Sequence, residues 1–451
     1  MILQKMNKIP IKKRVSAALA LVLAFACGAA FASTIAAALP TSASPYRNLG
    51  VFAQALAYVE RSYVDEPDQD KLIQGAVRGM VLELDPHSAY MDPQAYRVLN
   101  ADTEGRFGGI GVEIDASDGW LTVVGVFDGG PAERARIEPG DRFVFIERQE
   151  ARDMPISEAI RLMRGEPGTP VHFRLRRQKS QQVVDMTLRR EIIRVHAVEA
   201  RLLADQVVYL QLKAFQKTTT TELRRALDEA ASRAAKNGGI QGLILDLRNN
   251  PGGLLDEAIG VSDEFLSRGT IVTTRGRGGV LIHEATANAA GTRPEWPMVV
   301  LINQYSASAA EIVSGALQDN KRATIVGLRS FGKGSVQTIN EFPDGSALKL
   351  TIARYYTPSG RSIQAEGIEP DVIVEQIDPD KAKGAQSSIS EAALEGHLPN
   401  PLQDESKVIP EPKRDEARTL PQLSGTDAVA FDDDYQARIA HQVLRAFIAA
   451  K

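Results

Sequence analysis

Apolar residues follow two different periodicities in the first half of the chain. Between positions 46 and 84 they recur every three or four residues, which predicts two amphipathic helices, Tyr46–Val64 and Asp70–Leu84. From Phe107 to Arg190 short alternating runs are separated by glycine and proline turns. That pattern predicts a β-rich module with a helix at Ile156–Met163.

The second half of the chain alternates strand and helix patterns, from about Val195 to Glu375. The buried-type strands Ile240–Leu247 and Met298–Ile302 each precede a helical pattern, which predicts an α/β core with a partly parallel sheet. Further strands are predicted at Val207–Leu212, Ser335–Glu341 and Ala347–Tyr356. After Glu375 the composition shifts to Pro, Ser, Lys and Asp, as in a solvated linker. The closing helix Tyr435–Ala450 carries an apolar stripe. We expect this stripe to pack on a partner helix or another subunit, and not on the core, which predicts a homo-oligomer.

Together these patterns predict a mixed α+β and α/β protein of several domains. A length of 451 residues has room for about three domains of roughly 150 residues. The expected segments are an export segment at 1–39, a helical region at 40–95, a β-rich module at 96–190, the α/β core at 191–375, a linker at 376–430 and a C-terminal helix at 431–451.

Composition excludes several classes of protein. Hydrophobic residues make up 43% and charged residues 24%, which excludes wholesale disorder. A net charge of −4 and a pI near 6.0 give no electrostatic footprint for nucleic acid. Cys27 is the sole cysteine and the six histidines show no ligand-like spacing. We therefore expect no disulfide, no metal site and no cofactor.

The N-terminus predicts export. A lysine-rich stretch precedes the uncharged apolar run Val15–Leu39, which is longer than the 7–15-residue core of most signal peptides. The run is long enough to span a bilayer, which takes about 20 residues. Ala30-Phe31-Ala32 nevertheless offers a cleavage site. A cleaved signal and a retained anchor both stay open, and either predicts a periplasmic protein, soluble or tethered to the inner membrane.

A junction between a predicted strand and a predicted helix carries two candidate nucleophiles, Ser306 and Ser308. A serine at the positive end of a helix is placed where an alkoxide and an oxyanion are stabilised. The alternative is that either serine only caps the helix.

Lys333 is the candidate base, because a serine nucleophile needs one and no histidine lies in a comparable position. Burial lowers the pKa of a lysine and favours its neutral form. Gln337 shares a strand face with Lys333 and is placed to orient the amine. The alternative is a solvated lysine in a turn. A phosphate-binding loop is rejected, because Gly334 stands where Ser or Thr is required.

Four motifs together carry a family resemblance. They occur in the order "LILDLRNNPGGLL", "NQYSASAAEIVSGALQD", "GLRSFGKGSVQ" and "YYTPSGRSIQ". Over about Tyr46 to Glu375 the chain resembles the carboxy-terminal processing peptidases, also called tail-specific proteases. These are PDZ-containing serine proteases with a Ser-Lys dyad, and the resemblance implies a protease core of the ClpP/crotonase type.

The resemblance also implies roles for individual residues. In the family the lysine follows the serine by 25 positions, as Lys333 follows Ser308, which favours Ser308 over Ser306. Ser308 is then the nucleophile, Lys333 the general base and Gln337 the residue that orients it. The implied oxyanion hole consists of the amide of Ala309 and an amide from Gly252 or Gly253.

The β-rich module resembles a PDZ domain in the order of its turns. The expected carboxylate-binding loop consists of Gly108, Gly109, Ile110, Gly111 and Val112. Such a loop holds the C-terminus of a peptide that is added as a strand to the sheet. Arg164 matches an arginine linked to regulation in the family; the alternative is a solvated surface residue.

The expected function is that of an exported serine endopeptidase. It would recognise the exposed C-terminal tails of envelope proteins, with an adaptor protein as a further possible partner and no nucleic acid. Two alternatives stay open: a catalytically inactive PDZ-bearing envelope scaffold, and a hydrolase of small esters.

Overall fold

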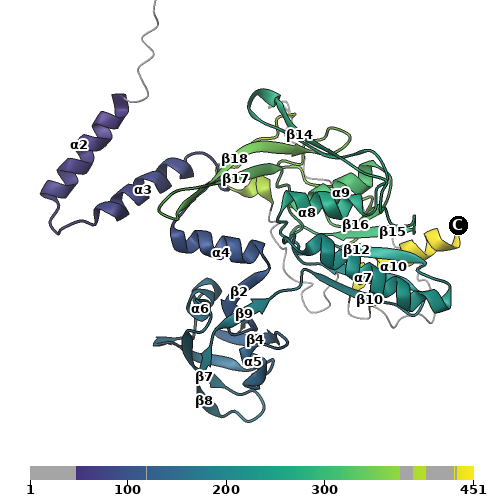
Figure 1. The fold of residues 1–451 in the computed structure, drawn as a ribbon, viewed down its shortest axis with the longest axis horizontal. Helices are drawn as coiled ribbons and strands as arrows, with labels where there is room; N and C mark the ends of the chain where they lie inside the picture. The colour runs from purple at the N-terminus through teal and green to yellow at the C-terminus, as the bar shows by residue number, and fades with distance from the viewer. Residues whose placement is uncertain (1–46, 118, 376–389, 403–430, 432–433, 451) are drawn as a thin grey trace, which may run out of the picture. The chain divides into compact units, whose positions relative to one another are not determined.

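A computed structural model describes residues 47–117, 119–375, 390–402, 431 and 434–450 of the chain (Figure 1). The chain divides into two compact units, residues 1–76 and 77–451. The expected export segment at 1–39 lies outside the described residues. Within the described ranges, no helix is both long enough and apolar enough to cross a membrane.

The first unit contains helix α2 (Arg47–Ser62) and the beginning of α3 (Gln69–Leu82). Both helices were predicted, with ends that differ by one or two residues. The apolar residues Leu49, Phe52 and Tyr58 of α2 are exposed. The spacing of these residues therefore predicted the helix correctly, but it did not mean that their side chains are buried.

The PDZ-like module is an antiparallel sheet with two short helices, α5 (Pro131–Arg134) and α6 (Ile156–Met163). Phe143 and Leu175 lie at the centre of its core with no exposed surface. The sheet has the order β3-β4-β5-β7-β8, with β6 beside β5. Its strands are β3 (Val112–Ser117), β4 (Trp120–Val126), β5 (Arg142–Ile146), β6 (Gln149–Glu150), β7 (Pro170–Arg176) and β8 (Val183–Arg189).

A two-stranded ribbon joins the two ends of this module. It pairs β2 (Arg106–Gly109) with β9 (Glu191–Arg194). Helix α4 (Pro93–Thr103) precedes the ribbon and was not predicted. The sequence does contain a signal for the start of this helix, the Asp92-Pro93 pair. The Asp92 carboxylate caps the helix, and a proline suits its first turn.

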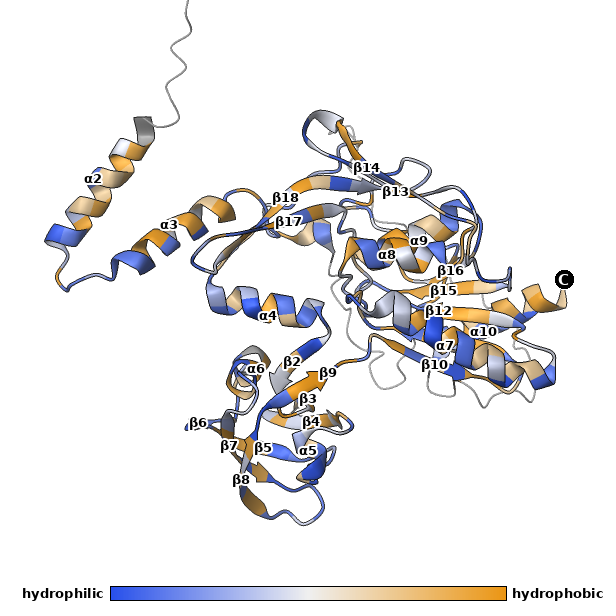
Figure 2. Cartoon of the chain, in the orientation of Figure 1, coloured by the Kyte–Doolittle hydropathy of each residue, from blue (hydrophilic) through white to orange (hydrophobic). Residues whose placement is uncertain are grey.

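The α/β core is built on a six-stranded sheet in the order β10-β11-β12-β15-β16-β19, parallel except for the β10–β11 pair. Its central strands, β12 and β15, are strongly hydrophobic (Figure 2). Helices α7, α8 and α9 cover one face of the sheet. The strands are β10 (Val198–Leu202), β11 (Val207–Leu212), β12 (Gly242–Asp246), β15 (Met298–Ile302), β16 (Thr324–Gly327) and β19 (Val372–Ile373); the helices are α7 (Thr219–Ala234), α8 (Leu255–Asp263) and α9 (Ala309–Asp319).

A second sheet has the order β1-β18-β13-β14, with β17 also paired to β18. The sequence predicted β17 and β18 with the same ends but missed the other three strands. The strands are β1 (Ala89–Met91), β13 (Thr270–Arg275), β14 (Leu281–Thr286), β17 (Ser335–Glu341) and β18 (Ala347–Tyr356). Single 3₁₀ turns are η2 (Ala235–Asn237), η3 (Arg277–Gly279) and η4 (Glu391–Ala393).

The prediction that the C-terminal helix packs away from the core is wrong. Helix α10 (Tyr435–Ala449) lies on the second face of the core sheet, where Ala440 and Leu444 are buried against Ile244 and Val299. Parallel strands are apolar on both faces and need a cover on each. The stripe is used within the chain, so it no longer argues for an oligomer.

The prediction of a solvated linker is wrong at Glu391 and Asn400, which are buried, whereas the rest of residues 390–402 are at least partly exposed. Glu391 in η4 is fully buried. Its carboxylate accepts hydrogen bonds from His87 at 2.8 Å and from Gln364 at 2.9 Å. Polar composition signals exposure only when the polar groups lack partners inside the protein. Residues 376–389 and 403–430 lie outside the described part of the chain.

Replacing Leu444 by alanine should destabilise the core. The side chain is fully buried beneath the sheet, so the substitution leaves a cavity that costs about 2–5 kcal/mol. Urea denaturation followed by circular dichroism measures the change, with Gln442→Ala, on the exposed side of the same helix, as the control. If both variants unfold like the unmodified protein, α10 does not stabilise the core.

Candidate active site

The junction between β15 and α9 carries both candidate serines. Strand β15 ends at Ile302, and Ser308 is the N-cap residue of α9. Ser308 has φ 54° and ψ −112°, which is strained for a residue with a side chain. A sharp strand-to-helix turn with a strained serine is also the geometry of the nucleophile elbow in hydrolases.

The two serines have different hydrogen-bond partners. Ser306 Oγ donates to the Leu247 carbonyl at 2.8 Å and accepts from the Asn303 amide at 2.9 Å. It therefore joins the ends of two strands. Burial raises the pKa of the Tyr355 phenol, which lies near the Ser308 side chain, to about 12. Ser306 is engaged in the backbone of the turn. Ser308 caps α9 in a capping box with Glu311, which uses the Ser308 Oγ as an acceptor and leaves its proton for a base, so Ser308 is the candidate nucleophile.

Glu311 is fully buried and joins Ser308 to the loop that carries Lys333. Its Oε2 accepts from the backbone amides of Ser308 at 2.7 Å and Lys333 at 2.9 Å. Its Oε1 accepts from Ser330 Oγ and from the Gly332 amide. Burial raises the pKa of Glu311 to about 7, although these hydrogen bonds act in the opposite direction. One carboxylate oxygen thus holds the backbones of Ser308 and Lys333 together.

Lys333 and Gln337 interact as the sequence predicted. Lys333 Nζ donates to Gln337 Oε1 at 2.9 Å. Burial lowers the pKa of Lys333, the positive charge of Lys349 lowers it further, and nearby acidic residues oppose the shift. The lysine is therefore not a solvated turn residue. A lowered pKa increases the neutral fraction, which is the form that accepts a proton.

Gly252 and Gly253 lie in the turn after β12 and have different neighbours. A Cβ on Gly252, at φ 97°, would lie 2.8 Å from the Cβ of Ser308. A Cβ on Gly253 would instead meet the carbonyl oxygen of Phe215 at 2.2 Å. The Gly252 amide is engaged, because it donates to Asn250 Oδ1 at 2.8 Å. The backbone at Gly252 thus touches Ser308, and the next amide along the chain is that of Gly253.

A buried ion-pair cluster attaches this turn to α10. Arg248 Nη2 lies 2.6 Å from carboxylate oxygens of both Asp246 and Asp434. Asp246 also accepts from the Tyr209 hydroxyl at 2.6 Å. Burial lowers the pKa of Arg248, but its bonds with Asp434 and Asp246 outweigh burial and raise it. The C-terminal helix therefore contributes to the conformation of the glycine turn.

An apolar hollow of about 580 Å³ adjoins the serine. Residues from the glycine turn, the β15–α9 junction and the lysine loop line it: Asn249, Pro251, Tyr305, Ala307 and Phe331. Ala307 directly precedes Ser308 in the chain. A hollow lined by aromatic and aliphatic groups suits an apolar side chain.

The predicted carboxylate-binding loop is closely packed. Gly108 and Gly109 belong to β2, and a Cβ on Gly108 would lie 2.0 Å from the Gly165 carbonyl oxygen. Ile110 is buried and Gly111 has φ 79°. The loop thus needs its glycines for packing, and its role in peptide binding stays a prediction.

Arg164 is anchored within the chain and is only partly exposed. Its guanidinium pairs with Asp102 of α4 at 2.7 Å and lies 4.3 Å from the ring centroid of Phe107. These two contacts hold a side chain that is still partly exposed, so the alternative of a surface residue is not decided. The regulatory role of Arg164 stays a prediction.

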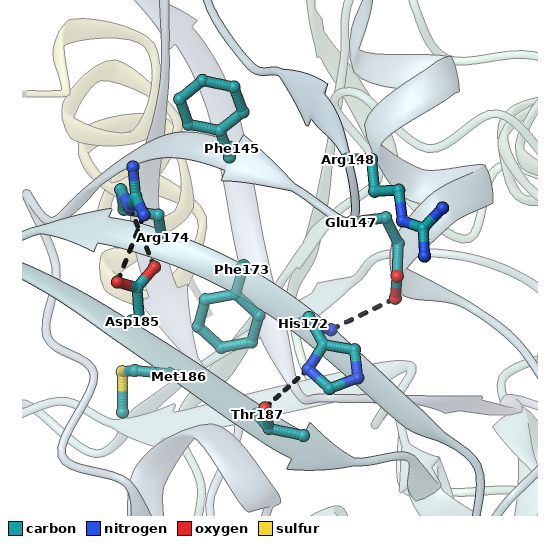
Figure 3. Close-up of a pocket in the computed structure, with 9 residues that line it drawn as sticks. All are labelled: Phe145, Glu147, Arg148, His172, Phe173, Arg174, Asp185, Met186 and Thr187. Atoms are coloured by element: carbon teal, nitrogen blue, oxygen red, sulfur yellow. Dashed lines mark hydrogen bonds and ion pairs between the residues drawn. The ribbon is translucent and has the colours of Figure 1, made fainter.

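A pocket of about 450 Å³ lies on strands β5, β7 and β8 of the PDZ-like module (Figure 3). Its polar side chains pair with each other. Arg174 binds Asp185 at 2.8 Å, and His172 Nδ1 lies 2.7 Å from Thr187 Oγ1. The loop at 108–112 does not line it. Across the described residues, no group of three His, Cys, Asp or Glu side chains is arranged to hold a metal ion.

Comparisons with known proteins assign the family. The profile of peptidase family S41 matches residues 206–374, and that of the activating protease CtpB N-terminal domain matches residues 30–95. A carboxy-terminal-processing protease of Bartonella bacilliformis is 43% identical over 353 residues, which cover 78% of this chain and 81% of that protein. The chain belongs to the carboxy-terminal processing proteases of family S41. The resemblance stated from the sequence motifs is confirmed, and the chain is a serine-type peptidase.

Two further members of this protease family are similar. The carboxy-terminal processing protease CtpA of Bacillus subtilis is 35% identical over 333 residues, covering 73% of this chain and 69% of that protein. The solved structure of a photosystem II D1 C-terminal processing protease is 29% identical, with a TM-score of 0.44; the match covers 72% of this chain and 92% of that one.

Sequence reasoning missed two groups that build the site of this S41 protease. Glu311 had a signal, because Ser308 and Glu311 form the Ser-x-x-Glu pattern of a capping box. Arg248 had none, since its partner Asp434 lies at the far end of the chain. The structure does bring Ser308, Lys333, Gln337 and Gly252 to the same region of the core.

Replacing Glu311 by glutamine should impair catalysis strongly. One carboxylate oxygen becomes an NH₂ group that faces two hydrogen-bond donors, so the Ser308 and Lys333 loops separate. Because displacements of about 1 Å cost about 100-fold in rate, we expect a loss of that size in kcat/KM for an unfolded protein substrate. Glu229→Gln, on the exposed face of α7, is the control. Activity equal to that of the control would contradict the role given to Glu311.

Proposed function

We propose that this S41 protease is an exported endopeptidase that cleaves envelope proteins which present a free C-terminal tail. Ser308 is the nucleophile, Lys333 is the general base and Gln337 orients the lysine. The observation that carries this proposal is the Glu311 carboxylate, which binds the backbone amides of Ser308 and Lys333 through one oxygen. It keeps nucleophile and base adjacent in a buried site.

The proposed reaction is acyl transfer. Neutral Lys333 takes the proton of Ser308 Oγ as the oxygen attacks the peptide carbonyl. The lysine then gives that proton to the leaving amine, and an acyl-enzyme remains on Ser308. Water, deprotonated by the same lysine, attacks the ester, and the C–O bond to Ser308 breaks to release the carboxylic acid. The lysine returns the proton to Ser308 Oγ, which restores both the serine and the neutral lysine.

The proposed oxyanion hole consists of the Ala309 and Gly253 amides. Ala309 is the first residue of α9, so its N–H has no intrahelical acceptor and lies at the positive end of the helix. Gly253 is chosen over Gly252 because the Gly252 amide already donates to Asn250. Two such donors stabilise the oxygen that becomes negative in the transition state.

Substrate recognition is assigned to two regions. The PDZ-like module would hold the C-terminal tail, with its carboxylate at the loop Gly108–Val112. The apolar hollow beside Ser308 would take an apolar side chain next to the scissile bond. Arg164 would link tail binding to activity through its contacts with Asp102 and Phe107.

The proposed location is the periplasm, with the chain soluble or tethered to the inner membrane. The basic stretch and the apolar run Val15–Leu39 support export. Cleavage after Ala32 would release the chain, whereas a retained segment would anchor it.

Ser308→Ala and Lys333→Ala should each abolish proteolysis, with a loss of at least about 1,000-fold, because each removes a group that the chemistry requires. The assay follows cleavage of fluorescently labelled casein. Ser232→Ala and Lys179→Ala change exposed residues of the same types and serve as controls.

Three outcomes would contradict the proposal. Near-normal turnover by Lys333→Ala would exclude the dyad. A folded unmodified protein that binds casein without cutting it would favour the inactive scaffold. Faster turnover of a small ester than of casein would favour the esterase.

The pH dependence of kcat/KM should report the lysine. The rate rises as pH rises through the pKa of Lys333, and the lowered pKa puts this rise below the ordinary lysine value of 10.5. Lys349→Met removes a positive charge that lowers the pKa of Lys333, so the rise should move to higher pH. A profile that still climbs at pH 10.5, or that does not move in Lys349→Met, would contradict the assignment of the base.

A further inference from the structure

The turn Asp85–Ser88 forms hydrogen bonds that lead to the proposed base. It lies between α3 and β1, and β1 pairs with β18 in the register Ala89↔Lys349. This pairing holds Ser88 against Thr351, whose amide donates to Ser88 Oγ at 3.0 Å. The proposed catalytic steps make no use of this turn.

Asp85 is the fixed acceptor at the start of this set of bonds. Its Oδ1 accepts from the amides of His87 and Ser88, both at 2.8 Å, and its Oδ2 accepts from Ser88 Oγ at 2.7 Å. Burial raises the pKa of Asp85, but these bonds and one from Thr351 outweigh burial and hold the pKa below its usual value. The side chain is thus a carboxylate, which accepts hydrogen bonds and donates none.

The ionised Asp85 decides where the Thr351 hydroxyl proton points. Thr351 Oγ1 lies 3.1 Å from Asp85 Oδ1, so the hydroxyl must donate in that direction. Ser88 Oγ also lies 3.4 Å from Thr351 Oγ1, but it has a shorter bond to Asp85 Oδ2 at 2.7 Å for its single proton. The lone pairs of Thr351 Oγ1 remain for Gln337 Nε2, at 3.2 Å. A threonine held in this way accepts a hydrogen bond from Gln337.

The orientation of the Gln337 amide follows from this arrangement. Its NH₂ group faces Thr351 Oγ1 and Ser335 Oγ, the latter at 2.9 Å, and its carbonyl oxygen faces Lys333 Nζ at 2.9 Å. In the flipped orientation the NH₂ group would face the lysine and donate to its lone pair. That lone pair is what a neutral lysine needs to take the proton of a serine.

We propose that Asp85 and Thr351 are positioning residues, which fix the amide of Gln337 so that it accepts from Lys333 and leaves the lysine lone pair free for Ser308. This inference rests on the proposed function, because it assumes that Lys333 is the base. The chain of contacts is Asp85–Thr351–Gln337–Lys333, and we refer to it as the orienting relay.

The test of the orienting relay is Thr351→Val in the full chain. Valine has the shape of threonine and suits a strand but lacks the hydroxyl, so Gln337 is free to flip. We expect kcat on labelled casein to fall about 10- to 100-fold with KM unchanged. Thr351→Ser restores the hydroxyl and should recover most of the rate. Thr338→Val, at an exposed position of the neighbouring strand β17, controls for the same substitution outside the relay.

A double variant separates positioning from stability. If Thr351 acts through Gln337, adding Thr351→Val to Gln337→Ala lowers kcat no further. If the double variant instead loses the same factor that Thr351→Val loses alone, the relay is refuted. A loss of stability would lower the rate in both backgrounds. The comparison therefore separates positioning from stability even when Thr351→Val lowers the Tm.

Failure of the relay is distinguishable from failure of the proposed function. Unchanged kcat in Thr351→Val, or an equal loss in Thr351→Ser, refutes the relay while Lys333→Ala still abolishes cleavage. Near-normal cleavage by Lys333→Ala refutes the proposed base and the relay with it.

Discussion

The active region of this S41 protease depends on one buried carboxylate. Glu311 accepts hydrogen bonds from two loops, and one of its oxygens binds the backbone amides of Ser308 and Lys333. The strained backbone at Ser308 persists because this bond, the start of α9 and the contact with Gly252 all act on the same residue. Burying a carboxylate is costly, and its bonds to backbone and hydroxyl groups offset that cost.

Burial also affects the protonation of Lys333. Burial lowers the pKa of Lys333, and a lysine that must be neutral gains nothing from a close ion pair. For the base proposed here, an uncharged acceptor such as Gln337 is a suitable neighbour, since it would orient the amine without strongly favouring its protonated form. The nearby carboxylates bind hydroxyl groups and backbone amides, as Asp85 and Glu311 do.

Segments from both ends of the chain complete the site. The turn Asp85–Ser88 reaches Gln337 through Thr351, and η4 places Glu391 next to Gln364, which accepts from the Gly334 amide. At the other side, Arg248 links the strand that precedes the glycine turn to Asp434 at the start of α10. The core is thus supported by three regions that the sequence analysis placed outside it: the N-terminal helical region, the linker and the C-terminal helix.

The sequence by itself determined the local elements and the chemical inventory. The pattern of apolar and polar residues predicted α6, β11, β15, β17 and β18 with the same ends, because that pattern is local. The family resemblance of the sequence motifs implied Ser308, Lys333 and Gln337. Tertiary structure decided the contacts between residues that are far apart in the sequence. These are the packing of α10 on the sheet, the pairing of Arg248 with Asp434, and the contact of Asp85 with Thr351. The physical reason is that a hydrogen bond or a buried face is satisfied by whichever group the fold brings near, and no local pattern records that group.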